Sequence, residues 1–286
     1  MTIEHISDTA RWVAFYRAME TERADAIFRD PYARRLAGPK GEQIVNTIKQ
    51  GRQMAWAMIV RTAVMDEMIL DRVQAGVDLV VNLAAGLDAR PWRLALPPAL
   101  HWVDVDLPDI LRYKTEMLGG AAPVCRYEAV EADLTDEAAR TSVFTRLGAQ
   151  AMNALIVTEG LLIYLTADQV TALARDLHAV PSFRWWLNDV ATPLLLTFME
   201  RSWGDSVRAG NAPFQFAPPD AAEFFAPLGW TQVMFRPTVD DARRLHREMR
   251  FMWLWRTLGK LSSQERQEAM RRMSAVELLE RGRVPV

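Results

Sequence analysis

The sequence predicts an α/β fold in which an open, doubly wound and mostly parallel sheet carries helices on both faces. The first observation is that short apolar runs alternate with helical patterns after Gly76, as they do in parallel βαβ units. The second is an apolar run that ends in a glycine turn at Gly86 and is followed 20 residues later by an acid, Asp106. A strand, a glycine turn and such an acid are the parts with which open α/β sheets hold an adenosine ribose.

The N-terminal segment, residues 1–76, has helical spacing. Ser7 or Asp8 can cap a first helix, whose apolar residues recur at helical intervals. Asp30-Pro31-Tyr32 restarts a helix, since proline is tolerated in a first helical turn. A longer helix striped by methionine and valine is expected to end near Gly76.

The next segment, residues 77–191, is expected to form the core of the sheet. Five strands are predicted in it, and a helix follows each of the second, third and fourth. The predicted strands are Leu79–Ala84, His101–Val105, Arg126–Val130, Ala154–Thr158 and Arg184–Val190, and the predicted helices are Pro108–Leu118, Asp136–Leu147 and Ala167–His178.

The segment after the fifth strand, residues 192–228, is too long for an ordinary connection and predicts a lid over the site. In the last segment, residues 229–286, Thr231–Phe235 is a candidate last strand, and Asp240 to Leu279 returns to helical spacing. The chain has no internal repeat or low-complexity tract. The sequence therefore predicts a single domain, residues 1–286, with additions to its core.

The composition argues against several classes of protein. A net charge of −2 over 286 residues gives no sign of a nucleic-acid-binding surface. The single cysteine, Cys125, excludes an internal disulfide and a thiolate zinc cluster, and no metal site is predicted. The first residues lack the regions of a signal peptide, and no apolar run reaches membrane-spanning length. We therefore expect a cytoplasmic protein with no membrane partner.

Polar residues follow each of the five predicted strands, at the edge where an open parallel sheet binds ligands. They are Gly86 and Asp88, Asp106, Asp133, Glu159 and Tyr164, and Asn188 and Asp189. Their recurrence after all five strands is a stronger signal than any one of them. The alternative is that Asp and Asn only form turns and cap helices. That alternative has most weight for Asp133, because Thr135 could cap the helix that follows.

The glycine turn narrows the choice of ligand. A dinucleotide pyrophosphate usually requires several glycines, but Gly86 is followed by Leu87, Asp88 and Ala89. An adenosine ligand without phosphates does not require them, and S-adenosylmethionine is the common one. A nicotinamide-dependent oxidoreductase remains an alternative, since it would use the same strand, turn and acid.

At these motifs the chain resembles the leucine carboxyl methyltransferase family of class I methyltransferases, including its bacterial polyketide O-methyltransferase branch of the tetracenomycin type. The matching motifs occur in family order from about residue 8 to residue 190. They are Arg29-Asp30-Pro31-Tyr32-Ala33, Val60-Arg61-Thr62, Val81 to Arg90, Val105-Asp106-Leu107-Pro108, Ala132-Asp133-Leu134 and Thr158 to Leu165. The resemblance implies a Rossmann-like, seven-stranded sheet. Beyond Thr192 little is similar.

The resemblance also implies how S-adenosylmethionine is held. Arg61 would pair with the methionine carboxylate, which a guanidinium fork suits; without the family match, an arginine on a solvated helix face is the ordinary interpretation. Asp106 would accept hydrogen bonds from both ribose hydroxyls, and Gly86 would allow close backbone approach. The other implied residues are Asp133 and Leu134 beside the adenine, Glu159 and Gly160 at the amino and sulfonium end, and Asp88, which alternatively braces the turn with Arg90. Arg11 is the candidate substitute for a cofactor-binding lysine of the phosphatase-modifying members.

The acceptor decides whether a general base is required. A carboxylate is ionised at neutral pH and requires none, whereas a hydroxyl benefits from a base. Tyr164 and Asp189 are the candidate catalytic residues, because both lie at strand ends. His101 and His178 are expected to be structural, and His5 and His246 lack a local motif.

Aromatic residues between Thr192 and Phe225 predict a pocket for a flat acceptor. The leading hypothesis is an S-adenosylmethionine-dependent O-methyltransferase acting on a hydroxyl or carboxyl of a small, aromatic or polyketide-like secondary metabolite. The alternatives are carboxyl methylation of a protein C-terminus, the nicotinamide-dependent oxidoreductase, and a binding protein that keeps the fold without catalysis. No nucleic-acid partner is predicted, and the sequence does not indicate an oligomeric state.

Overall fold

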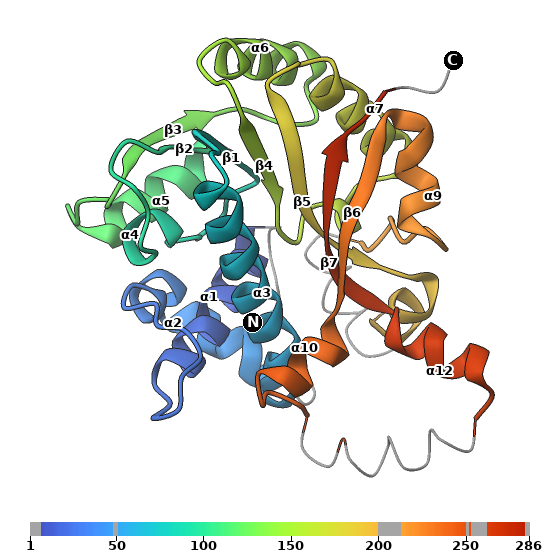
Figure 1. Cartoon of the computed structure of the whole chain (residues 1–286). Helices are drawn as coiled ribbons and strands as arrows, with labels where there is room; N and C mark the ends of the chain where they lie inside the picture. Colours follow the sequence, from blue (N-terminus) through green and yellow to red (C-terminus); the bar gives the residue numbers. More distant parts are fainter. Residues whose placement is uncertain (1–6, 48–50, 200–212, 250–251, 253–261, 284–286) are drawn as a thin grey trace.

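A seven-stranded sheet forms the centre of the structure, a computed structural model that describes residues 7–47, 51–199, 213–249, 252 and 262–283 (Figure 1). The strand order is β3-β2-β1-β4-β5-β7-β6. The strands are β1 Leu79–Leu83, β2 His101–Asp106, β3 Arg126–Glu131, β4 Ala154–Thr158, β5 Phe183–Ala191, β6 Trp230–Pro237 and β7 Ser274–Arg281. Strand β7 runs antiparallel to both of its neighbours, and the pairs among β1 to β5 are parallel.

The order of the strands reverses at β1. The chain moves outward from β1 to β2 and β3, and then returns to place β4 on the other side of β1. Ligands of open α/β sheets bind outside the carboxyl ends of the strands at such a reversal. The topology therefore predicts a ligand site at the carboxyl ends of β1 and β4.

Helices cover both faces of the sheet, which confirms the predicted doubly wound fold (Figure 1). One face packs against α3 and α10, and the other against α6, α7 and α9. The helices are α1 Ser7–Thr21, α2 Ala33–Thr47, α3 Ala55–Gln74, α4 Arg90–Arg93, α5 Pro108–Leu118, α6 Glu137–Gly148, α7 Ala167–His178, α9 Ala221–Phe225, α10 Thr238–Arg244 and α12 Gln264–Arg271, with short 3-10 turns η1 Gly51–Met54, η2 Leu162–Tyr164 and η3 Ala226–Leu228.

The residue before α6, Asp136, caps this helix. The Asp136 side chain accepts hydrogen bonds from the backbone N–H groups of Ala138 and Ala139. The expectation that Thr135 could be the cap is therefore wrong, and α6 begins one residue later than predicted. An aspartate is a strong N-cap because its side chain accepts from N–H groups that have no partner inside the helix.

The prediction of helical spacing from Asp240 to Leu279 is wrong at its end, where Ser274–Arg281 forms β7. Val276 and Leu278 face the core beneath α3 and α10, and Leu279 faces the opposite core. A strand that is buried on both faces shows no simple alternation of apolar and polar residues, so its pattern is easily confused with that of a buried helix.

The predicted lid, residues 192–228, is described only in part. Residues 193–199 are helical and α9 lies at its other end, whereas 200–212 lie outside the described residues. The lid therefore remains a prediction. Within the part of the chain that is described, no helix combines the length and apolar character required to cross a bilayer.

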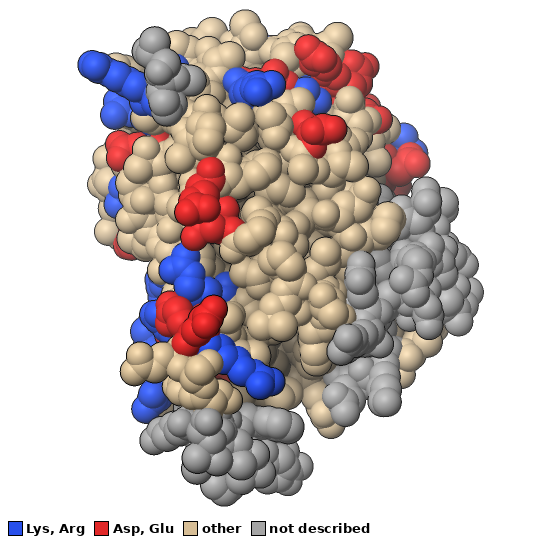
Figure 2. Space-filling model, turned by 90° about the vertical axis from the view of Figure 1, so that its right-hand side faces the viewer, with Lys and Arg blue, Asp and Glu red and all other residues tan. Residues whose placement is uncertain are grey.

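The edge strand β6 lies on a face whose centre carries few charged side chains (Figure 2). Val233 and Met234 of β6 are 46% and 37% exposed. Charged groups lie mainly in a column to the left of this centre and toward the upper right (Figure 2).

Glu277 in β7 is a completely buried acid. One of its carboxylate oxygens accepts a hydrogen bond from Gln232 Nε2 at 2.5 Å. Burial raises the pKa of Glu277 to about 7 because the charged form is poorly solvated there. The folded chain thus holds a proton on this carboxyl over a pH range in which an unfolded chain would release it.

Replacing Glu277 with glutamine should stabilise the protein at high pH. Below about pH 4.5 the carboxyl is protonated in both states. Between about pH 4.5 and pH 7 the unfolded chain releases the proton while the folded chain keeps it, so the stability of the native chain falls over this range and levels off above it. Above pH 8 Glu277→Gln should be more stable than the native chain by about 3 kcal/mol, from about 1.4 kcal/mol for each unit of pKa shift. Urea unfolding at pH 5 and pH 8 measures the difference. An equal effect at both pH values would contradict the assignment.

Candidate active site

A cavity of about 620 Å³ opens at the carboxyl ends of the parallel strands, next to the reversal in strand order. Helix α1, η1 and α3 form part of its wall. Asn188 and Arg11 do not line it, but the other ten residues that the sequence proposes for the site all line this one cavity. They are Arg61, Gly86, Asp88, Asp106, Asp133, Leu134, Glu159, Gly160, Tyr164 and Asp189.

The glycine turn after β1 is held to the end of β2 by Asp106. Its carboxylate accepts the Gly86 N–H at 2.6 Å and the Leu107 N–H at 2.7 Å. Burial raises the pKa of Asp106, and these two hydrogen bonds oppose the shift. Each carboxylate oxygen still has a lone pair that can accept a further hydrogen bond. Asp106 can therefore bind a ligand hydroxyl without releasing the turn.

The backbone of this turn is strained where it meets helix α1. Gly86 has φ 53° and Ala84, which is not a glycine, has φ 52°. A Cβ atom on Gly86 would lie 3.2 Å from the Cβ of Ala10 in α1, which is a tight contact. Strained residues of this kind gather at ligand sites. The sequence predicted the role of Gly86 but not the strain at Ala84, for which it has no local signal.

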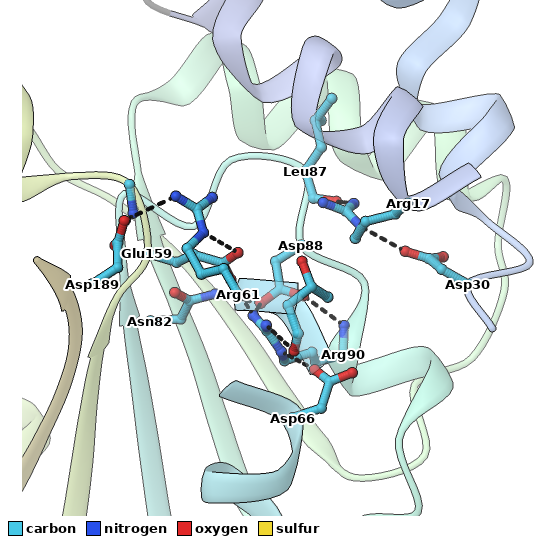
Figure 3. A network of polar contacts seen from close by, with 12 residues as sticks. Arg17, Asp30, Arg61, Asp66, Asn82, Leu87, Asp88, Arg90, Glu159 and Asp189 are labelled. Carbon is cyan, nitrogen blue, oxygen red and sulfur yellow. Dashed lines mark hydrogen bonds and ion pairs between the residues drawn. The ribbon is translucent and has the colours of Figure 1, made fainter. Parts of the chain in front are cut away.

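Arg61 reaches the cavity from α3 and bridges two acids from neighbouring strands (Figure 3). Its Nε donates to Glu159 at 3.1 Å and its Nη1 to Asp189 at 2.9 Å, and the Gly160 N–H donates to the other Asp189 oxygen at 2.6 Å. A Cβ on Gly160 would lie 3.2 Å from Arg61 Nη1, so the glycine leaves room for the guanidinium. Arg61 is only 8% exposed. It is therefore not the solvated helix-face arginine of the alternative interpretation.

Arg90 connects the glycine turn to the rest of the site (Figure 3). Its Nε donates to Asp66 at 2.6 Å, and its Nη1 donates to both Asp88 and Glu159 at 2.7 Å. Asn82 Nδ2 donates to Asp88 at 3.0 Å. Asp88 thus braces the turn together with Arg90, as one of the two sequence interpretations expects, although it also lines the cavity.

The guanidinium groups determine the charge of Glu159. Burial alone would raise the pKa of this carboxyl, but Arg90 and Arg61 lower it to about 2. For Arg61, burial would lower the pKa of the guanidinium, and the carboxylates of Asp189 and Glu159 outweigh that effect and raise it. Glu159 therefore remains an anion at every physiological pH.

A second cluster of buried polar groups surrounds Asp104 in β2, the strand that also carries Asp106. Asp104 is completely buried and accepts hydrogen bonds from Lys114 Nζ at 2.5 Å, Tyr127 Oη at 2.8 Å and Trp102 Nε1 at 3.0 Å. Lys114 lies on α5, the helix that follows Asp106 in the chain. Sequence reasoning did not find Lys114. The signal was a lysine on the buried side of α5, which indicates a buried acid nearby.

The two residues that are predicted to flank the adenine, Asp133 and Leu134, also line the cavity. Asp133 accepts hydrogen bonds from the N–H of Thr135 at 2.8 Å and from its hydroxyl at 2.7 Å, and these lower the pKa of Asp133. Leu134 lies beside it in the cavity wall. One polar and one apolar group are therefore available there for a flat base.

Another part of the cavity wall is mostly apolar. It is built from α1, η1, α3, the helical stretch 193–199 and Phe214, all of which pack in or against one core cluster. The residues that belong both to this cluster and to the cavity wall include Trp12, Tyr16, Met54, Met58, Met199 and Phe214. Aromatic residues of the predicted lid do therefore reach the cavity, at Phe214 and Phe216. Trp203 lies outside the described residues.

Tyr164 joins the polar and apolar parts, with its ring 5.7 Å from that of Phe214. Burial raises the pKa of Tyr164 to about 12, although Arg61 and a hydrogen bond with Thr9 oppose the shift. The Tyr164 hydroxyl keeps its proton at neutral pH, which disfavours the expectation that it acts as a general base.

Three further residues considered in the sequence, His101, His178 and Arg11, do not line the cavity. His101 contacts Glu128 at 3.1 Å and His178 contacts the Gly282 carbonyl at 3.0 Å, both outside the cavity wall, which agrees with structural roles. Arg11 stacks 3.7 Å above the ring of Tyr113 and does not line the cavity. His5 lies outside the described residues.

The model of the leucine carboxyl methyltransferase family matches residues 10–178, more than half of the chain. The chain belongs to the leucine carboxyl methyltransferase family. A relative from Parafrankia sp. is 34% identical over 64% of this chain and 63% of its own length, and one from Mycobacterium marinum is 30% identical over 69% and 70%. Both are provisionally named S-adenosyl-L-methionine-dependent methyltransferases. The chain thus spans slightly less than two thirds of the length of the first relative.

Solved structures agree with the fold of this family member. A DUF574 family protein from Streptomyces avermitilis superposes with a TM-score of 0.60 at 15% identity, over 96% of this chain and 97% of the other. The predicted class I, Rossmann-like sheet is confirmed.

Proposed function

We propose that the protein is an S-adenosylmethionine-dependent O-methyltransferase that acts on a hydroxyl or carboxyl of a small, flat, aromatic or polyketide-like secondary metabolite. The observation that supports this most is the composition of the cavity at the carboxyl ends of the strands. A polar half with Asp106, Arg61 and Glu159 adjoins an apolar half with Tyr164 and Phe214. A nucleoside donor and an apolar acceptor can therefore lie side by side.

The polar half fits the parts of S-adenosylmethionine in order along the sheet edge. Asp133 and Leu134 would flank the adenine, Asp106 would accept from the ribose hydroxyls, and Arg61 would pair with the methionine carboxylate. The carboxylates of Glu159 and Asp189 would favour the positively charged sulfonium end. When bound, S-adenosylmethionine supplies a methyl group that its sulfonium activates, and the chain aligns the acceptor with it.

Titration calorimetry tests this assignment directly. S-adenosylhomocysteine should bind and NADH should not. Asp106→Ala should weaken the binding of S-adenosylhomocysteine by at least tenfold, from the ~1.5–3 kcal/mol of a hydrogen bond to a charged group. Asp109→Ala, an exposed acid on α5, is the matched control and should leave the affinity unchanged. Tight NADH binding, or equal affinity in both variants, would count against the proposed function.

A further inference from the structure

The charges of the cavity point to a narrower class of acceptor. Resting on the proposed function, we propose that the acceptor is an uncharged phenol with a flat apolar body, rather than a carboxylate, and that Asp189 receives its proton. The inference rests on the acids and bases that line the cavity, on their partners, and on the apolar wall opposite them.

Carboxylates outnumber guanidiniums in the described part of the cavity wall. The acids are Asp88, Asp106, Asp133, Glu137, Glu159 and Asp189, and the cations are Arg17, Arg61 and Arg140. Each of these cations already holds an acid: Arg17 pairs with Asp30 at 2.9 Å, Arg140 with Asp176 at 2.5 Å, and Arg61 with Glu159 and Asp189. The described wall therefore favours a cation and disfavours a second anion.

Two of these three cations, Arg17 and Arg140, also donate to backbone carbonyls. Arg17 also donates to the Leu87 carbonyl beside the glycine turn, and Arg140 to the Leu134 carbonyl at the adenine end. Of the three lining cations, Arg61 is the one that pairs with Glu159 and Asp189. Its guanidinium is assigned to the methionine carboxylate. Arg90 offsets the charge of Glu159, but Asp189 has only Arg61 as a guanidinium partner in the described part of the chain. A carboxylate acceptor beside Asp189 would therefore be repelled once Arg61 also holds the methionine carboxylate.

A neutral phenol meets no such repulsion. Its ring can pack against the apolar wall formed by Met58, Met199 and Phe214. Tyr164 contributes a hydroxyl that keeps its proton and can hydrogen-bond to the acceptor oxygen. The wall thus suits a flat apolar body that carries one hydroxyl.

A phenol requires a group that removes its proton, and Asp189 is the carboxylate placed to do so. Its two oxygens already accept from Gly160 N–H and Arg61, and each has a further lone pair. The phenol oxygen forms a bond to the methyl carbon while the carbon–sulfur bond breaks and its electron pair passes to sulfur. The phenol proton moves to Asp189 and then to water. A sulfonium and a carboxylate become a thioether and a neutral acid, so charge balances.

Matched acceptors test the inference. Methyl-labelled S-adenosylmethionine is supplied with 2-naphthol, with 2-naphthoate, and with one- and three-ring pairs of the same kind. Phenols should be methylated with a kcat/KM at least tenfold higher than that of the paired carboxylates. The product should be an ether, which is stable in base, whereas a methyl ester releases volatile methanol. Preferred methylation of the carboxylates, or methylation of no phenol in the panel, overturns the proposal.

The pH profile of Asp189→Asn tests the role of this residue. Besides Asp189, the titratable groups of the surrounding elements are Arg61 of α3, Glu159 after β4 and Tyr164 of η2. At pH 7 the variant should methylate a phenol about 100-fold more slowly, since a general base contributes at least that factor. Its rate should then rise tenfold per pH unit as the phenol itself ionises, while the native rate stays level. Parallel profiles would overturn the assignment.

Binding of S-adenosylhomocysteine separates the two proposals. Asp109→Asn, at an exposed acid that does not line the cavity, is the control and should match the native chain throughout. If S-adenosylhomocysteine does not bind to the native chain, the proposed function fails and this inference fails with it. If it binds and the carboxylates are the better acceptors, only the inference fails.

Discussion

Replacing Arg90 with methionine should lower the free energy of unfolding by about 3–5 kcal/mol, the cost of removing one partner from a buried ion pair. Arg90 is 1% exposed and donates to Asp66, Asp88 and Glu159. Methionine fills a similar volume but leaves these acids with fewer partners in a poorly solvated site. Urea unfolding followed by circular dichroism measures the loss.

Arg112→Met is the matched control for this prediction. Arg112 also pairs with an acid, Asp109, but its side chain is 66% exposed. Exposed pairs contribute at most about 1 kcal/mol, so this variant should remain close to the native stability. If Arg90→Met cost no more than Arg112→Met, the buried network would not be the support of the site that its geometry indicates.

Replacing Arg61 with methionine should weaken the binding of S-adenosylhomocysteine at least 30-fold. Loss of one partner from a buried, hydrogen-bonded charge pair costs about 2–5 kcal/mol, which is about 30-fold or more in affinity. Two effects act together: the methionine carboxylate loses its cation, and Glu159 and Asp189 become less well compensated. Calorimetric titration gives the change in Kd.

Arg72→Met controls for changes in α3 itself. Arg72 lies on the same helix, stacks 4.9 Å from the ring of Trp185 and does not line the cavity. Its removal should leave the affinity unchanged. Arg61→Lys should recover only part of the loss, since an ammonium cannot make the paired contacts of a guanidinium fork. Full affinity in Arg61→Met would remove this residue from the site.

Much of the core was predictable because its signals are local. Pro108 opens α5 and Gly119, with φ 59°, ends it, so both bounds follow from the sequence. Each proposed site residue lies near or just after the end of a strand or, like Arg61, belongs to a family motif, and carboxyl ends of parallel strands meet at one edge. The shared cavity of all ten residues follows from that rule.

The rest depends on tertiary contacts that leave no local pattern. Arg90 meets Asp66 and Glu159, which lie 24 and 69 residues away in the chain. The contact of Ala10 with the glycine turn depends on how α1 packs, and β7 lacks alternation because both of its faces are buried. The substrate region beyond Thr192 has neither a motif nor a family match.

A crystal structure of the protein with S-adenosylhomocysteine tests the central claim most directly. The ribose hydroxyls should lie on Asp106, the methionine carboxylate on Arg61, and the sulfur toward the apolar wall beside Tyr164. Calorimetry on the same protein should give one site. Density for the ligand outside this cavity, or a bound ligand whose ribose lies away from Asp106, would contradict the account.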